Sequence, residues 1–251
     1  MGILAFFGKL IAFFLLGIVV LLVGASAFIL AAPNSYEQMK GDMLDVLPEQ
    51  MSTLSSSGMP EFTMEELILV CSAPQQDPNI GKVCAKVNSG EVTTPDEAKK
   101  EIFKILLSEE IKKLDQELNP KIEQIKSYGM YPVIGAIVLS LVSLLFLRLA
   151  ASSFLGALKI MCSMVATISL LSVIGLFLMQ QYVPPILEKE LSKGAFVGGS
   201  SEMQPIIEAM APYLVKWGLM FINPVFYATI GLLVISVIGY LVLRFWVKKS
   251  K

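Results

Sequence analysis

The sequence predicts an all-α membrane protein: a four-transmembrane-helix bundle with a mainly helical extracytoplasmic domain, built from a large first and a small second outer loop. The composition is one reason, because 55% of the 251 residues are hydrophobic and only 16% are charged, against about 25% charged in a typical soluble domain. The second is that four apolar stretches approach or exceed the roughly 20 residues that a helix needs to cross a bilayer. The third is that the acidic residues are confined to two segments, whereas the remaining segments carry basic residues only.

The predicted segments follow from these apolar stretches. Residues 1–32 form the N-terminus and first transmembrane helix, 33–127 the large outer domain, 128–150 the second transmembrane helix, 151–159 a short inner turn, 160–183 the third transmembrane helix, 184–216 a small outer helical hairpin, 217–247 an interfacial turn and the fourth transmembrane helix, and 248–251 a basic tail. The first stretch exceeds the about 7–15 apolar residues of a signal peptide. We therefore expect it to remain as a helix.

Charge predicts the orientation in the membrane. Three parts of the chain carry basic residues and no acid: the N-terminal segment, the connection between the second and third apolar stretches, and the C-terminal segment. Their basic residues are Lys9, Arg148, Lys159, Arg244, Lys248, Lys249 and Lys251. All 21 acidic residues lie in 33–127 or 184–216. Because basic residues in short segments stay in the cytoplasm, we expect both termini there and both acidic segments outside.

The expected location is a cell membrane, with the lipid bilayer as the first partner. Neither Asn34 nor Asn88 stands in an Asn-x-Ser/Thr acceptor sequence, although both are followed by serine. Since a eukaryotic secretory route commonly glycosylates such acceptors in outer segments, their absence favours a prokaryotic membrane.

Cys71 and Cys84 lie in the large outer segment, where disulfides persist. A disulfide across this spacing would stabilise the fold by about 3 kcal/mol in the chain-entropy account. A redox pair is the weaker alternative, because the Cys-x-x-Cys spacing and histidine are missing; reduced thiols are another. Cys162, in the third apolar stretch, is interpreted as a packing residue, with palmitoylation as the alternative.

Capping patterns predict where the outer helices begin. Thr63 with Glu66, and Thr94 with Glu97, form capping-box patterns, and Pro95 suits the first position of a helix. An earlier helix is expected between Pro33 and Pro48, with a flexible break over 52–60. Residues 86–94 are interpreted as a loop or a hairpin. The long helix after Thr94 is expected to bend or restart at Asn119–Pro120.

A near-heptad stripe on that long helix is the candidate interaction seam. Its members are Leu107, Ile111, Leu114, Leu118, Ile122 and Ile125. Such a stripe packs either on the rest of its own domain or, as in a coiled coil, on a second subunit. In the second outer segment we expect two helical arms joined by a turn at 197–201, and a turn at Asn223–Pro224 before the last membrane helix.

Small and hydroxyl side chains give the membrane helices faces for close packing. They are Gly17, Gly24, Ala136, Ser140, Ser143, Ala166, Ser169, Ser172, Gly231 and Gly239. These faces suit the packing of the bundle itself or of a partner helix. The four stretches hold no ionisable residue away from their ends, which argues against a transport pathway.

Motifs for catalysis are missing. The chain has no histidine, no phosphate-binding glycine loop and no Gly-x-Ser-x-Gly turn. We expect no catalytic residue, no metal, no cofactor and no nucleic-acid partner.

Three functions remain as hypotheses. The leading one is a non-enzymatic membrane protein whose acidic, disulfide-stapled outer domain serves assembly or binds a protein partner, by self-association or otherwise. The second is a transporter or channel, or its accessory subunit, with a path lined by Ser140, Ser143, Ser169 and Ser172. The third is a membrane thiol oxidoreductase that uses Cys71 and Cys84.

Overall fold

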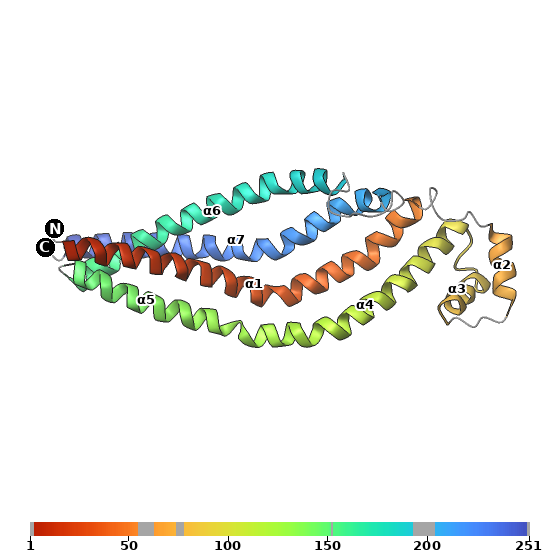
Figure 1. The fold of residues 1–251 in the computed structure, drawn as a ribbon, viewed down its shortest axis with the longest axis horizontal. Helices are drawn as coiled ribbons and strands as arrows, with labels where there is room; N and C mark the ends of the chain where they lie inside the picture. The colour runs from red at the N-terminus through yellow and green to blue at the C-terminus, as the bar shows by residue number, and fades with distance from the viewer. Residues whose placement is uncertain (1–2, 55–62, 74–77, 152, 193–203, 250–251) are drawn as a thin grey trace. The chain divides into compact units, whose positions relative to one another are not determined.

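The computed structural model describes residues 3–54, 63–73, 78–151, 153–192 and 204–249 (Figure 1). Its helices are α1 (Ile3–Leu54), α2 (Met64–Ser72), α3 (Pro78–Asn88), α4 (Pro95–Tyr128), α5 (Met130–Ala150), α6 (Phe154–Ser192) and α7 (Gln204–Lys249). None of these described residues is in a β-strand, and residues 89–94 form a loop in which Gly90 takes a φ of 76°. The predicted all-α class is confirmed.

Four helical stretches are long and apolar enough to cross a membrane, which indicates a multi-pass membrane protein. They lie within Ala5–Glu49, Pro95–Ala150, Phe154–Leu191 and Met210–Trp246, and their apolar windows have a mean hydropathy between 2.3 and 2.8. The prediction of four spanning helices is confirmed to this extent.

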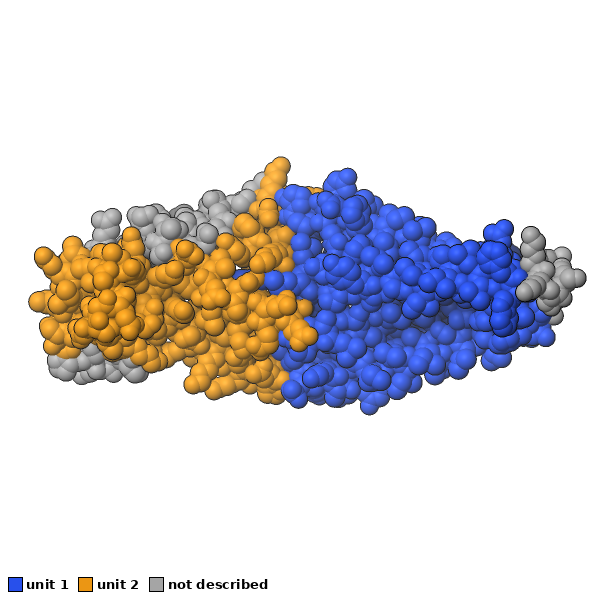
Figure 2. Space-filling model, turned by 180° about the vertical axis from the view of Figure 1, so that it is seen from behind, with its two compact units in different colours: residues 1–33, 122–185, 217–251 blue, residues 34–121, 186–216 orange. Residues whose placement is uncertain are grey.

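The chain divides into two compact units, coloured separately in Figure 2. Unit 1 comprises Met1–Pro33, Ile122–Pro185 and Trp217–Lys251, and unit 2 comprises Asn34–Lys121 and Ile186–Lys216. The apolar parts of α1, α5, α6 and α7 fall in unit 1. Unit 2 holds α2, α3 and the polar parts of the longer helices.

Small residues let the helices of unit 1 approach closely. A Cβ at Gly8 on α1 would lie 3.2 Å from the Phe146 carbonyl oxygen on α5. Nearby, Ala12, Leu147 and Ala157 form a fully buried cluster that joins α1, α5 and the start of α6. Small side chains at Gly8, Ala12 and Ala157 therefore allow these helices to pack closely, as expected for helices that associate in lipid.

Polar and aromatic contacts fix α7 within the same unit. The rings of Phe28 on α1 and Phe221 on α7 lie 6.0 Å apart. On the α6 side, Gln180 donates a hydrogen bond of 3.0 Å to the Asn223 side chain, and the Lys159 ammonium lies 5.5 Å from the centre of the Tyr240 ring. α7 is thus held against both α1 and α6.

The main difference from the sequence-based expectations concerns proline. We predicted helix ends, turns or bends at Pro33, Pro48, Asn119–Pro120 and Asn223–Pro224, but α1, α4 and α7 continue through these positions. A proline inside a helix removes one backbone hydrogen bond, and neighbouring packing offsets that loss. Pro48, for example, is fully buried.

The turn between the second and third membrane helices is also shorter than the predicted 151–159. α5 ends at Ala150 and α6 begins at Phe154. The Ser153 hydroxyl accepts a hydrogen bond of 3.1 Å from the Gly156 amide, which is how a serine caps a helix start. This hydrogen bond allows α6 to begin at Phe154, before the predicted start at residue 160. The predicted turn at 197–201 lies outside the described residues, as does most of the predicted break at 52–60.

Ionic contacts stabilise unit 2 where the polar part of α1 packs on α4. The Tyr36 hydroxyl donates to Asp115 Oδ1 at 2.9 Å, and Lys40 Nζ lies 3.1 Å from Asp115 Oδ2. Burial, followed by the hydrogen bond to Asp115, raises the pKa of Tyr36 to about 12. The hydroxyl therefore stays protonated and keeps its bond to the carboxylate at neutral pH.

Replacing Asp115 is expected to loosen this contact. Asp115→Asn keeps an acceptor for Tyr36 but loses the charge that faces Lys40, and Asp115→Leu loses both. Because Asp115 and Lys40 are each about a quarter exposed, solvent weakens the ion pair, and we expect a loss of about 1 kcal/mol for the Asn variant and more for the Leu variant. Thermal unfolding of the purified protein measures both. The control is Glu110→Gln on the same helix, since the pair of Glu110 with Lys113 is largely exposed; an equal loss in the control would contradict the prediction.

Candidate interaction surface

The most distinctive part of unit 2 is a small helical assembly made of α2, α3 and residues 95–109 of α4, here called the cap. Both predicted capping boxes are present. The Thr63 amide donates to the Glu66 carboxylate at 2.8 Å, and the Glu66 amide donates to Thr63 Oγ1 at 3.3 Å. Thr94 and Glu97 repeat the exchange at 3.1 and 3.3 Å. These local bonds set where α2 and α4 begin.

The hydrogen bonds that Glu97 accepts make the start of α4 sensitive to acid. Hydrogen bonds from the Thr93 amide above all, then from the Thr93 hydroxyl and the Thr94 amide, lower the pKa of Glu97 below its usual 4.5. A lowered folded-state pKa means that the stabilisation is complete above the unfolded-state pKa and is lost as the pH falls through the folded-state pKa. We expect the protection of the amides in the first turn of α4, measured as their exchange relative to the intrinsic rate at the same pH, to fall as the pH drops below about 4.5. Glu97→Gln should remove this pH dependence, whereas Glu117→Gln, an exposed carboxyl later in α4, should not.

A disulfide joins the two short helices of the cap. Cys71 on α2 and Cys84 on α3 are bonded, with their Cα atoms 5.0 Å apart. The predicted disulfide is confirmed. Cys84 is only 5% exposed, so its sulfur is largely shielded from external thiols. Cys162 is a free, partly buried cysteine in unit 1.

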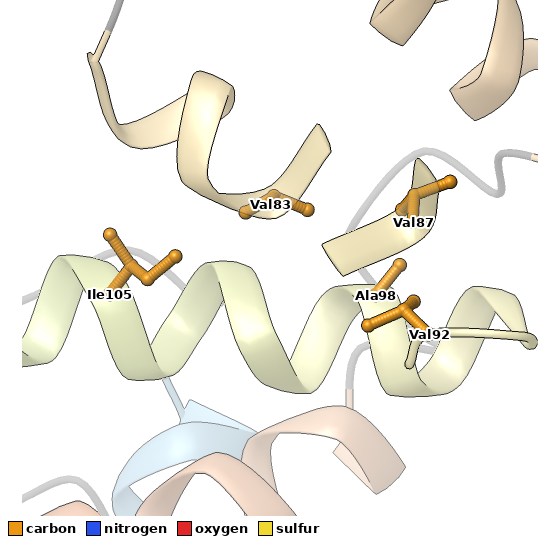
Figure 3. Close-up of a cluster of buried hydrophobic side chains, with 5 residues drawn as sticks. All are labelled: Val83, Val87, Val92, Ala98 and Ile105. Atoms are coloured by element: carbon orange, nitrogen blue, oxygen red, sulfur yellow. The ribbon is translucent and has the colours of Figure 1, made fainter. Parts of the chain in front are cut away.

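The core of the cap is compact and apolar. Its buried members are Val83 and Val87 from α3, Val92 from the loop, and Ala98 and Ile105 from α4 (Figure 3). α2 has no buried residue of its own and covers this core with the partly buried side chains of Met64, Leu67 and Cys71. The attachment of α2 thus relies on a few contacts and the disulfide.

Beside this core the three helices leave an apolar groove of about 330 Å³, here called the cap groove. It is lined by Leu67, Asn79, Ile80, Val83, Cys84, Ile102, Ile105 and Leu106. Asn79 is the one amide among these side chains, and its Nδ2 donates to Glu109 Oε2 at 2.8 Å. The groove therefore presents a mainly hydrocarbon surface whose single polar member is already hydrogen-bonded.

Large apolar side chains surround the cap groove without being buried. Ile80 and Leu106, which line the groove, are 42% and 49% exposed. On α2, the exposed Glu65 and Glu66 precede Leu67, the residue of this helix that lines the groove. A clustered apolar surface with charged neighbours is typical of sites that bind another macromolecule.

The predicted interaction seam on α4 is covered unevenly. Ile111 is buried, Leu107, Leu118 and Ile122 are partly buried, and Leu114 and Ile125 are exposed. The seam also crosses the boundary between the units, because Ile122 and Ile125 belong to unit 1 and the others to unit 2. In the first turns of α4 the buried positions are Ala98, Lys99 and Ile105 instead.

The small residues predicted for the packing faces of the membrane helices differ in burial and in the distance to atoms of neighbouring helices. Gly24, Ala136, Ser143 and Ser169 are buried, Gly17, Ser140, Ala166, Ser172 and Gly239 are partly buried, and Gly231 is exposed. A Cβ at Gly24 would lie 3.1 Å from Val225 Cγ1, and one at Gly239 would lie 3.2 Å from Cys162 Sγ. A Cβ at Gly17 or at Gly231 would have no atom of another side chain or helix within 4 Å.

Sequence reasoning missed the residues of the cap groove. Ile80, Ile102 and Leu106 stand in ordinary amphipathic sequence, so nothing in the pattern distinguishes them. The run Ile68–Leu69–Val70 did carry a signal, because three consecutive apolar residues on a short helix cannot all face one core. Among the described residues, no group of three His, Cys, Asp or Glu side chains is placed to hold a metal ion.

Comparisons of the chain with known protein families, with curated proteins and with solved structures give no match.

Proposed function

We propose that this chain is a non-enzymatic multi-pass membrane protein that holds the cap outside the cytoplasm and binds another protein through the cap groove. The observation that carries the proposal is the combination of a disulfide-stapled scaffold with the exposed Ile80 and Leu106 of a mainly apolar groove. A scaffold that is already ordered loses little conformational entropy on binding.

The proposed orientation follows the charges. Both termini are cytoplasmic, because the basic residues in the short segments around the membrane helices have no acidic neighbours. The segments 33–127 and 184–216 are then outside, where a disulfide persists. The membrane is a cell membrane, and the missing glycosylation acceptors favour a prokaryotic one.

The proposed occupant is an amphipathic segment of a different protein with basic residues beside its apolar face. An apolar helix face suits a groove of this kind. The acidic side chains of Glu65 and Glu66 beside the apolar surface favour a basic partner. The two outer segments together hold all 21 acids of the chain, so a second copy of the same domain, or an anionic lipid surface, would meet like charge.

Two of the four serine hydroxyls of the transporter alternative are bonded within their own helix, whereas the buried Ser169 Oγ has no hydrogen-bond partner among the described residues. Ser140 and Ser143 donate to the Ala136 and Leu139 carbonyl oxygens of their own helix, both at 2.7 Å. Hydroxyls that are bonded within their own helix are typical of packing between membrane helices.

Site-specific photo-crosslinking in native membranes tests the proposal. A photoreactive amino acid at Ile80 or Leu106 should give a covalent adduct with a second polypeptide, and the same group at the exposed Gln116 should not. Ile80→Glu, which adds a charge to the groove at a residue outside the buried core of the cap, should abolish the adduct formed at Leu106. Equal adducts at Gln116, or none at either cap position, would refute the proposed binding role. A reporter fused after Lys251 tests the orientation, and it should be active only in the cytoplasm.

A further inference from the structure

A second groove, in unit 1, lies among the apolar helices. It has a volume of about 560 Å³ and is lined by residues of α1, α5, α6 and α7, among them Ser26, Ile137, Ser140, Leu158 and Leu232. This volume falls within the roughly 300–1,000 Å³ of known small-molecule sites. All its residues belong to one compact unit, so its shape does not depend on the placement of unit 2.

The groove is elongated along the helix axes. On α5 its lining runs from Val133 to Leu144, which at about 1.5 Å per residue corresponds to roughly 16 Å. That is about half of the roughly 30 Å hydrocarbon thickness of a bilayer. A long and narrow occupant suits this site better than a compact solute.

Its polar groups are already hydrogen-bonded. The Ser26 hydroxyl donates to the Leu22 carbonyl oxygen at 2.8 Å, and the Ser140 hydroxyl donates to the Ala136 carbonyl oxygen at 2.7 Å. The other lining residues are valine, alanine, isoleucine, leucine and methionine. A polar ligand would therefore lose its hydration without gaining a free donor from the groove, while a hydrocarbon chain would lose nothing.

The groove is open at the surface of unit 1. Ile137 and Leu141 line it and are also 57% and 58% exposed. At the other end of α5, the buried cluster of Leu147 and Ala157 closes the space beside α6. Since the apolar windows of these helices are long enough to cross a membrane, the medium at the opening is lipid, and the chain of a membrane lipid has direct access.

Two basic residues lie at one end of the groove. Arg148 is one helical turn from the lining residue Leu144, and Lys159 directly follows the lining residue Leu158. No acidic residue occurs between Glu123 and Glu188. A phosphate at this end would meet positive charge alone.

We propose that the groove binds an anionic phospholipid, with one hydrocarbon chain along α5 and its phosphate near Arg148 and Lys159. This site is separate from the cap groove and does not depend on the function proposed for the cap.

The test uses the full chain in nanodiscs that contain phosphatidylglycerol with a photoreactive group in its acyl chain. Peptide mapping should find adducts at Ile137 and Leu141 several-fold above those at Leu145, which is 67% exposed on the same helix but does not line the groove. Ile137→Trp should fill the groove and lower the Leu141 adducts several-fold, while Leu145→Trp should leave them unchanged. Equal labelling of Leu141 and Leu145, or an unchanged Leu141 signal in Ile137→Trp, would overturn the site.

A second arm examines the headgroup. Phosphatidylcholine with the same photoreactive chain should label the groove less than phosphatidylglycerol does, and the double variant Arg148→Gln, Lys159→Gln should remove the difference. Equal labelling by both lipids in the unchanged protein would overturn the anionic headgroup.

Discussion

Replacing Cys71 and Cys84 together with serine is expected to release α2 from the cap. The disulfide joins residues separated by 13 positions, and closing a loop of this length stabilises a fold by about 3 kcal/mol in the chain-entropy account. α2 depends on it strongly, because a helix of 9 residues with no buried side chain is marginal alone. Of the α2 side chains on the core, only the partly buried Met64 and Leu67 would remain unchanged.

Hydrogen exchange of the α2 amides measures this effect. In the unchanged protein they should be protected, and in the double variant they should exchange at rates close to those of an unfolded segment. A reducing agent should give the same result. Cys162→Ser is the control, since this cysteine lies in unit 1 and has no disulfide. Equal protection of α2 in the double variant would show that the apolar contacts are sufficient without the disulfide.

The release of α2 should also weaken the binding of the proposed partner. The cap groove is lined by Leu67 of α2 together with residues of α3 and α4, so releasing α2 removes one wall. Crosslinking from Leu106 to the proposed partner should therefore fall in the double-serine variant as well as in Ile80→Glu. The two variants differ in cause, because the first disassembles the groove and the second only places a charge in it.

Features that depend on neighbouring residues were predictable from the sequence. The two capping boxes involve side chains three positions apart, so Thr63 and Thr94 mark the starts of α2 and α4 without any tertiary contact. The disulfide was predictable because the charge pattern favours an oxidising location for both cysteines. The four apolar helices followed from composition and length alone.

Features that depend on distant packing were not predictable in the same way. Pro33 and Pro224 were taken as boundaries because proline removes a backbone hydrogen bond, yet α1 and α7 continue through them. The sequence predicts one stripe on α4 from Leu107 to Ile125, and the structure buries Ile111 of it but leaves Leu114 and Ile125 exposed. Before the stripe the cap covers Ala98 and Ile105, and within it α1 reaches α4 at Asp115, so different parts of α4 bury different faces.

Replacing Gly24 with leucine is expected to destabilise the bundle of unit 1, whereas the same change at Gly17 is expected to be tolerated. Both glycines lie on α1, seven positions apart. At Gly24 even a Cβ would lie 3.1 Å from Val225 Cγ1 on α7, while at Gly17 no atom lies within 4 Å. Overpacking of a close interface costs about 1–3 kcal/mol. Glycine in a helix interior is itself less favourable than other residues by about 0.5–1 kcal/mol, so Gly17→Leu should even gain stability.

Unfolding of the two variants in increasing concentrations of SDS, followed by circular dichroism, compares them directly. Gly24→Leu should unfold at a lower SDS concentration than the unchanged protein, and Gly17→Leu at the same or a higher one. The shared helix and the shared substitution cancel the contributions of propensity and hydrophobicity, so the difference reports the contact with Val225. Gly24→Leu combined with Val225→Ala, which removes the clashing methyl groups, should recover part of the loss. Equal unfolding of the two single variants would contradict the close packing of α1 on α7 at this position.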